Sequence, residues 1–348
     1  MRPKSRLFLG FLLLAGLCIL GFSLSLALGS VSIPFEKVLQ GLFGEEKIRS
    51  SWDLILTQYR LPKAITAFLA GAALSISGLL MQTYFRNPLA GPFVLGISSG
   101  ATLGVAAVIM LLDPLGIPWF SEGLGRNAGS LIAACLGSGL VMGMILMLAR
   151  KVRGPTTLLL VGLMFGYASG GLVNLLVYLS ESRQIQSFLI WSFGSFSRVP
   201  WEIMPLFYIP ILVALLASLL ASKPLNAIQL GENYARSLGV SVDRLRLWIL
   251  LCSSLLAGVV TAFCGPVAFV GIAVPHLCRG IFRTPDHRIL IPACIFMGGA
   301  LCLFADLGSQ LPGLEVTLPL NSITSLIGAP IVVWVLLRSN QRKGSFQS

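Results

Sequence analysis

Long apolar runs, each ended by a charge, a proline or a glycine, constrain this chain more than any other feature of its sequence. The 348 residues divide into about ten such runs, and a helix that spans a bilayer needs about 20 apolar residues. In lipid only helices and closed barrels satisfy every backbone polar group, and these runs are too long and continuous for alternating barrel strands. A chain that is 55% hydrophobic and 11% charged also lacks the charge that a soluble surface needs. The sequence therefore predicts an all-α polytopic membrane protein of about ten transmembrane helices, with residues 1–348 forming a single domain.

The basic residues behind the net charge of +12 are distributed along the chain in a way that indicates its orientation in the membrane. If the N-terminus is cytoplasmic and the chain crosses ten times, 17 of the 25 Lys and Arg residues fall on the inside. This asymmetry is the one that the positive-inside rule describes, and it favours cytoplasmic placement of both termini. The basic residues give no indication of a nucleic-acid partner.

The sequence lacks the residue patterns of common metal, nucleotide and catalytic sites. The seven Cys lie in or at the ends of apolar runs without a C-x-x-C pair, and only two His are present, so we predict no metal site and no bound cofactor. No G-x-x-x-x-G-K-[ST] loop or nucleophile motif occurs either. The chain is therefore not predicted to be an enzyme, and energy from ATP would have to come from a partner.

Glycines recur at helical spacing in three of the predicted spans. Small residues at this spacing allow two helices to approach closely, or they line a path, and packing is the commoner reason. Both readings stay open for these residues: Gly71 and Gly78 in the second span, Gly96, Gly100 and Gly104 in the third, and Gly162, Gly166 and Gly170 in the fifth.

A polar segment at residues 223–246 separates the two apolar halves of the chain. Leu230, Tyr234 and Leu238 recur every four residues, which places them on one face of a short helix. Gly239 is expected just after that helix, because glycine adopts positive φ without strain, and Asp243 is expected to cap the next helix. From periodicity alone, an ordinary solvated loop explains the segment equally well.

Four blocks of the sequence resemble the FecCD family. The segment Gly231-Glu-Asn-Tyr-Ala-Arg-Ser-Leu-Gly-Val240 is similar to the family's signature in the loop that docks on the ATPase subunit. Three other blocks agree in the same order, and they begin at Arg60-Leu-Pro-Lys63, Gly265-Pro266 and Leu326-Ile-Gly-Ala-Pro330. The resemblance thus covers most of the chain.

The resemblance implies the permease subunit of a binding-protein-dependent ABC importer for an iron-siderophore, haem or cobalamin. It implies a type II ABC importer fold in the inner membrane, a homodimer around a central path, two ATPase subunits inside and a substrate-binding protein outside. By resemblance, the ATPase-coupling residues are Gly231, Glu232, Tyr234, Ala235, Arg236, Leu238, Gly239 and Val240.

The same resemblance assigns Arg60 and Lys63 to docking of the binding protein, where both would pair with its acidic residues. Snorkelling of these two side chains to outer headgroups is the alternative. The family often has a further arginine four residues after Asp306, and this chain has Gln310 there.

The rival function is an ion-coupled secondary transporter of a small solute. Such a transporter needs ionisable groups near the bilayer midplane. All 13 acidic residues are predicted at span ends or in loops, with Asp306 nearest to an interior, and this placement argues against the rival.

Overall fold

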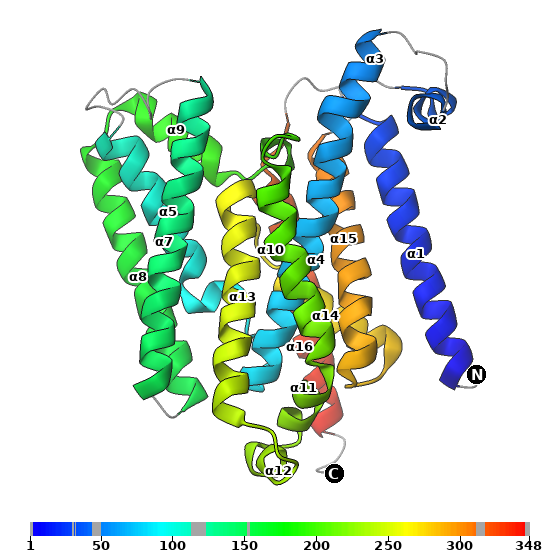
Figure 1. Ribbon diagram of the computed structural model, residues 1–348, viewed down its shortest axis with the longest axis vertical. Coiled ribbons are helices and arrows are strands. Elements are labelled where there is room, and N and C mark those ends of the chain that lie inside the picture. The colour runs from blue at the N-terminus through cyan, green and yellow to red at the C-terminus, as the bar shows by residue number, and fades with distance from the viewer. Residues whose placement is uncertain are drawn as a thin grey trace.

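The computed structural model describes residues 3–29, 31, 33–43, 50–112, 123–151, 154–310 and 317–344, and every regular element in these ranges is a helix (Figure 1). In chain order the elements are α1 (Pro3–Ala27), α2 (Phe35–Phe43), α3 (Ser50–Leu54), the π-helical η1 (Ile55–Arg60), α4 (Leu61–Phe85), the 3-10 turn η2 (Pro92–Leu95), α5 (Ile97–Ala107), the π-helical η3 (Val108–Leu112), α7 (Gly123–Lys151), α8 (Pro155–Leu179), α9 (Ser182–Ser192), the 3-10 turn η5 (Phe196–Arg198), α10 (Met204–Leu220), α11 (Ser222–Gln229), α12 (Glu232–Ser237), α13 (Val242–Cys264), α14 (Val270–Phe282), α15 (His287–Ser309) and α16 (Leu320–Gly344).

Apolar helices account for the predicted crossings. Six are long and apolar enough to span a membrane, and the pair α10 and α11, bent by 59° at its break, can supply a seventh. Three shorter apolar helices cover Ile97–Leu112, Val270–Phe282 and Leu320–Val333. The described part of the chain thus holds ten apolar helical segments in the predicted order, although three of them are shorter than the ~20 residues that a bilayer requires.

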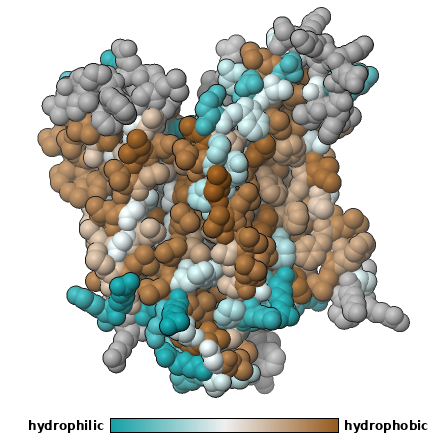
Figure 2. Space-filling view, viewed as in Figure 1, coloured by the Kyte–Doolittle hydropathy of each residue, from teal (hydrophilic) through white to brown (hydrophobic). Residues whose placement is uncertain are grey.

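The short helix α12 marks one end of the molecule, and the start of α1 and the end of α16 lie toward it (Figure 1). We call this the inner end, because the distribution of basic residues predicts that it faces the cytoplasm. Figure 2 shows hydrophobic side chains over the middle of the visible face and hydrophilic side chains gathered at the inner end. The opposite end, which carries α2, α3 and α9, is called the outer end.

Helix α4 is the centre of the packing. It is buried along most of its length and lies against α15, α13 and α14. Gly71 and Gly78 allow two of these contacts: a Cβ on Gly71 would lie 2.0 Å from the carbonyl oxygen of Gly298 in α15, and one on Gly78 would lie 1.7 Å from that of Gly271 in α14. Since no side-chain atom fits at such distances, the two glycines bring α4 into backbone contact with both neighbours.

A second group of helices, α5, α7 and α8, packs beside α4 and α13 (Figure 1). A Cβ on Gly100 would lie 2.6 Å from the carbonyl oxygen of Gly137 in α7, and one on Gly104 would lie 2.2 Å from that of Ala133. Gly96 differs from the prediction, because it precedes α5 as a turn residue with φ 73° rather than lying within the helix. Its own Cβ would meet the carbonyl oxygen of Gly162 in α8 at 2.8 Å.

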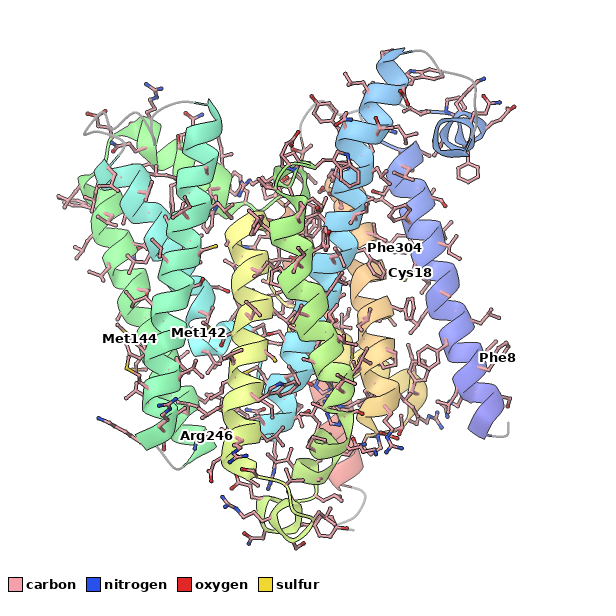
Figure 3. The ribbon with its side chains drawn as sticks, in the orientation of Figure 1. Phe8, Cys18, Met142, Met144, Arg246 and Phe304 are labelled. Atoms are coloured by element: carbon pink, nitrogen blue, oxygen red, sulfur yellow. The ribbon has the colours of Figure 1, made fainter. Side chains whose placement is uncertain are left out.

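Helix α1 covers the opposite side of the molecule against α15. The Cys18 thiol donates a hydrogen bond to the carbonyl of Phe296 at 3.1 Å, and Figure 3 shows Cys18 and Phe304 in the space between the helices. Phe8 points away from the protein and is 72% exposed, as expected of a side chain that faces lipid.

The second span begins earlier than predicted. The sequence placed its start at Arg60, whereas a continuous helix covers Ser51–Phe85. The π-helical residues Ile55–Arg60 continue directly into α4, so the helix extends outward beyond the basic pair Arg60 and Lys63.

Candidate functional site

The inner tip is built by two glycines on either side of α12. Gly231 precedes the helix with φ 130° and Gly239 follows it with φ 80°, and both values are strained for residues with a side chain. The N–H of Val240 donates to the carbonyl of Ala235 at 3.0 Å, and the N–H of Gly239 donates to that of Arg236 at 3.0 Å. These two bonds form a Schellman motif, so the prediction that Gly239 ends the helix in the left-handed region is confirmed.

The prediction for Asp243 was wrong. The residue that precedes α13 is Ser241, and Asp243 lies in the first turn of that helix. After the Schellman turn, α13 begins two residues earlier than predicted. In the first turn of the helix, the carboxylate of Asp243 still interacts favourably with the helix dipole. Asp243 also lies 3.6 Å from Arg236, but both side chains are exposed, so this ion pair contributes little.

Apolar side chains point away from the protein at this tip. Leu230, Tyr234 and Leu238 are 70%, 49% and 59% exposed, whereas Ala235 of the same segment is fully buried against the chain. Leu230 ends α11 and Leu238 ends α12, so only Tyr234 lies within the predicted helix. An apolar surface beside charged Glu232 and Arg236, beyond the membrane-spanning helices, is typical of a protein interface.

The tip is joined to the central helix through two arginines. The Arg246 guanidinium in α13, labelled in Figure 3, lies 5.8 Å from the ring centre of Tyr84 in α4. Arg86, just after α4, donates to the carbonyl of Ile228 in α11 at 3.2 Å. Both contacts connect the segments that flank α12 to the inner end of α4, and neither arginine was predicted to do so.

An outer cavity of about 1120 Å³ lies at the opposite end. The outer end of α4, the start of α7, helix α9, η5 and the last residues of α13 surround it. Arg60, Lys63 and Arg198 bring positive charge to its wall, while Leu131 and Phe263 bring apolar surface.

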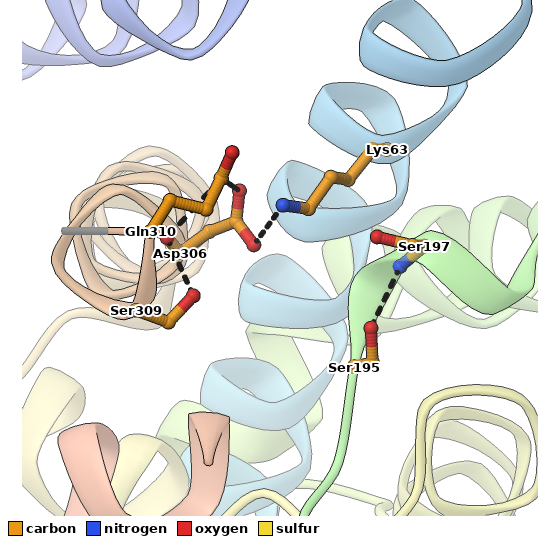
Figure 4. Close-up of polar contacts among 6 residues, drawn as sticks. All are labelled: Lys63, Ser195, Ser197, Asp306, Ser309 and Gln310. Carbon is orange, nitrogen blue, oxygen red and sulfur yellow. Dashed lines mark hydrogen bonds and ion pairs between the residues drawn. The ribbon is translucent and has the colours of Figure 1, made fainter. Parts of the chain in front are cut away.

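Lys63 is engaged inside the protein. Its ammonium lies 3.0 Å from Asp306 Oδ1, and the two side chains are 15% and 3% exposed (Figure 4). Gln310, the residue that departs from the family pattern, donates to Asp306 Oδ2 at 2.7 Å. The carboxylate of Asp306 therefore has a partner on each oxygen, and this buried group belongs to an outer ion pair.

Arg60 is also turned into the protein, and only 8% of it is exposed. Its guanidinium donates to the carbonyls of Leu26 and Ala27 at 2.7 and 2.9 Å, and to the carbonyl of Val31. These bonds join the start of α4 to the end of α1. Neither basic residue projects from the outer surface, and the docking role of both stays a prediction.

The outward face of α8 is open. Tyr167, at the middle of this helix, is 68% exposed, Tyr178 is 87% exposed, and Asn174 is exposed between them. Gly166 is in ordinary contact with Ser99, whereas Gly170 has no atom within 4 Å of the position of a Cβ. Of the eight predicted glycines, Gly170 is thus the one that meets no neighbour within the described chain.

Comparison with known proteins gives the same family along almost the whole chain. The profile of the FecCD transport family matches residues 17–338. The hemin transport system permease protein HmuU of Yersinia pestis is 35% identical over 346 residues, which cover 98% of each chain. The vitamin B12 import system permease protein BtuC of Klebsiella pneumoniae is 35% identical over 297 residues, covering 85% of this chain and 86% of the relative. A solved structure described as a metal-chelate type ABC transporter in an inward-facing conformation aligns with a TM-score of 0.80 and 27% identity, over 93% of this chain and 97% of the other.

Proposed function

The chain belongs to the FecCD transport family and is the permease subunit of an ABC importer in the inner membrane, and we propose that its cargo is an iron-siderophore, haem or cobalamin. The observation that carries the cargo class is the end-to-end match with a hemin permease, which extends over 98% of both chains. A relative named for vitamin B12 import supports the same class of large metal-containing cargo. The rival, a secondary transporter, has no such support.

The homodimer is part of the proposal, and the face of α8 supports it. A tyrosine hydroxyl at the middle of a span and a nearby amide would each be costly against lipid without a hydrogen-bond partner. Tyr167, Asn174 and Tyr178 are exposed along this face, and Gly170 leaves room beside them. A second copy opposite α8 would enclose these polar groups around a shared path through which the cargo passes.

Two ATPase subunits complete the importer on the inner side, and α12 is their proposed contact. The tip exposes Tyr234 and Leu238 between two glycines of positive φ, and Leu230 is exposed just before the first of them. Exposed aromatic anchors carry much of the energy of protein interfaces, while charges such as Glu232 and Arg236 fix their register. ATP hydrolysis would thus take place on the partner subunits and reach this chain through residues 231–240.

A substrate-binding protein would dock at the outer cavity. Arg60 and Arg198 line this cavity together with Glu202, and Lys63 in its wall is paired with Asp306. Acidic side chains of the binding protein would therefore meet the two arginines first. Delivery from above, followed by closure of the ATPases below, gives alternating access to the path between the two copies.

Uptake into proteoliposomes tests the proposal. The permease is reconstituted with its ATPase and binding protein, and accumulation of labelled haem, cobalamin and a ferric siderophore is measured with and without ATP inside. We expect ATP-dependent uptake of one cargo and no uptake with a proton gradient alone. Uptake that persists without the ATPase and follows the proton gradient would refute the importer.

A further inference from the structure

We propose that Asn226 and His287 are positioning residues of the coupling surface, which fix α11 to the inner ends of α4 and α15. When the ATPase displaces α12, the helices α11, α4 and α15 then move together. The inference rests on the proposed role of α12 and adds the residues that transmit its movement. Asn226 lies in α11, just before the tip, and His287, the first residue of α15, is 61 residues further along.

The orientation of the Asn226 amide follows from its neighbours. Its Nδ2 donates to Asp286 Oδ1 at 2.6 Å, and a carboxylate can only accept. The amide oxygen must therefore face the other way, where it lies 2.8 Å from the backbone N–H of His287 and 2.7 Å from His287 Nδ1. Since this oxygen can only accept, Nδ1 carries the proton.

Asn226 thereby caps a helix to which it does not belong. The first N–H groups of a helix have no partner within it. Asp286 accepts from the N–H of Arg288 at 3.0 Å, and Asn226 of α11 accepts from the N–H of His287. Burial alone would raise the pKa of Asp286, but the hydrogen bonds from Arg288 and Asn226 and the nearby positive charge lower it. The ionised carboxylate and the amide together hold the start of α15.

His287 extends the connection to the central helix. The side chain is fully buried, and its second ring nitrogen, Nε2, lies 2.8 Å from the hydroxyl of Thr83 in α4. The bond from Arg86 to the carbonyl of Ile228 gives α4 and α11 a second connection. Three segments that are distant in sequence therefore meet in one polar cluster directly behind the tip, in which His287 and Thr83 are buried and Asn226 and Asp286 are half-buried.

Beyond this cluster, α4 and α15 form one packed unit. Their backbones touch at Gly71 and Gly298, and the Ser75 hydroxyl lies 2.8 Å from the carbonyl of Cys294. The bend of 59° between α10 and α11 leaves the covalent connection a poor transmitter of force along the chain. The side-chain cluster is thus a direct connection between α11 and the helices that reach the outer end, beside the bond from Arg86 to Ile228.

The test is the number of cargo molecules moved per ATP in the reconstituted importer. Asn226→Ala should leave the ATPase bound and ATP hydrolysis active, while transport per ATP falls about tenfold, as expected when coupling between two sites is lost. Gln229→Ala removes an amide one turn further along the same helix and should leave the ratio unchanged. An unchanged ratio in Asn226→Ala would overturn the inference.

Two further variants keep the outcome decisive. If Asn226→Ala does not assemble, Thr83→Val removes only the hydroxyl that faces His287, and a wild-type ratio in this variant refutes the proposal. If Tyr234→Ala uncouples transport while the Asn226 and Thr83 variants do not, the coupling surface stands and the positioning role falls. If Tyr234→Ala also keeps the wild-type ratio, the proposed role of α12 itself falls.

Spin labels give a readout that a loss of stability alone would not change. Labels at Lys223→Cys in α11 and Arg288→Cys in α15, with the exposed Cys135 replaced by Ser, should report one distance that is constant through the ATP cycle. In Asn226→Ala the distance should change when ATP binds, because α11 then moves without α15. A constant distance in the variant contradicts the proposal.

Discussion

Replacing Gly78 with alanine tests the backbone contact at the centre of the molecule. In an exposed helix this change is favourable by about 1 kcal/mol, because alanine is the better helix former. At Gly78 the added Cβ would lie 1.7 Å from the carbonyl oxygen of Gly271. The sign of the effect therefore depends on whether α4 and α14 can separate.

The geometry sets the magnitude. A carbon and a carbonyl oxygen approach to about 3.3 Å at closest, so the two helices must move apart by about 1.5 Å at this point. Forcing extra volume into a packed core costs about 1–3 kcal/mol and sometimes more. Because backbone atoms rather than a flexible side chain receive the clash, we expect the upper part of that range. The net loss after the gain in helix propensity is then about 2 kcal/mol.

Thermal unfolding of the purified permease, followed by tryptophan fluorescence in detergent, measures the effect. Gly78→Ala and Gly71→Ala should both lower the melting temperature, the latter because its Cβ would lie 2.0 Å from the carbonyl oxygen of Gly298. Gly16→Ala is the matched control: the same change, in α1 with open space at that position and away from the proposed dimer face, should leave the melting temperature unchanged or raise it. A Gly78→Ala protein as stable as the wild type would show that α4 and α14 are not in backbone contact.

Three further predictions concern the two ends of the molecule. Asp306→Ala leaves Lys63 buried without its carboxylate and should cost about 3 kcal/mol of unfolding free energy, whereas Lys63→Met combined with Asp306→Leu should recover most of the loss; equal melting temperatures for both proteins would contradict a buried pair. Tyr234→Ala and Gly239→Val should reduce ATPase co-purification and cargo-stimulated ATP hydrolysis more than Arg236→Ala does. An aromatic side chain that becomes buried against the ATPase, and a glycine that takes positive φ without strain, contribute more to an interface than an exposed charge. Wild-type coupling in both variants would exclude α12 as the contact. The pKa of Asp286 is lowered in the folded protein, so its contribution to stability is present at neutral pH and is lost as the pH falls below about 4 toward the native pKa. Asp286→Asn should flatten this acid dependence of the free energy of unfolding. An unaltered pH profile would argue against the cap.

Features encoded by local pattern could be read from the sequence. The order of the apolar helices follows from composition over about 20 residues, and the positive φ of Gly239 follows from the preference of glycine for the residue after a helix. The four-residue periodicity before it was misleading, because Leu230 and Leu238 lie at the ends of two different helices. The error at Asp243 is local as well. The residue that caps a helix depends on where the preceding turn ends, and helix ends are the part of a structure that sequence patterns define least well.

Side-chain partners at the outer end could not be read in this way. Arg60 and Lys63 look alike in sequence, one helical turn apart in an apolar chain. In the structure Arg60 donates to carbonyls at the end of α1, whereas Lys63 pairs with the carboxylate of Asp306, 243 residues away. Both arrangements satisfy the same requirement, that a buried charged group must find hydrogen-bond partners or an opposite charge, and the packing of α1 and α15 around α4 decides which partner each residue finds.

Helix α4 connects the outer cavity with the inner polar cluster. Lys63 in the wall of the outer cavity and Thr83 in the inner polar cluster lie on this one helix, roughly 30 Å apart at the rise of an α-helix. Its only proline, Pro62, directly follows the π-helical residues Ile55–Arg60 and precedes the stretch from Lys63 to Thr83, and the glycine contacts with α14 and α15 hold the middle of the helix. If the proposed polar cluster passes a displacement of α11 to Thr83, the unbroken stretch of α4 between Thr83 and Lys63 passes it on to the outer cavity. The residue predicted to meet the binding protein and the surface predicted to meet the ATPase would then respond to one motion.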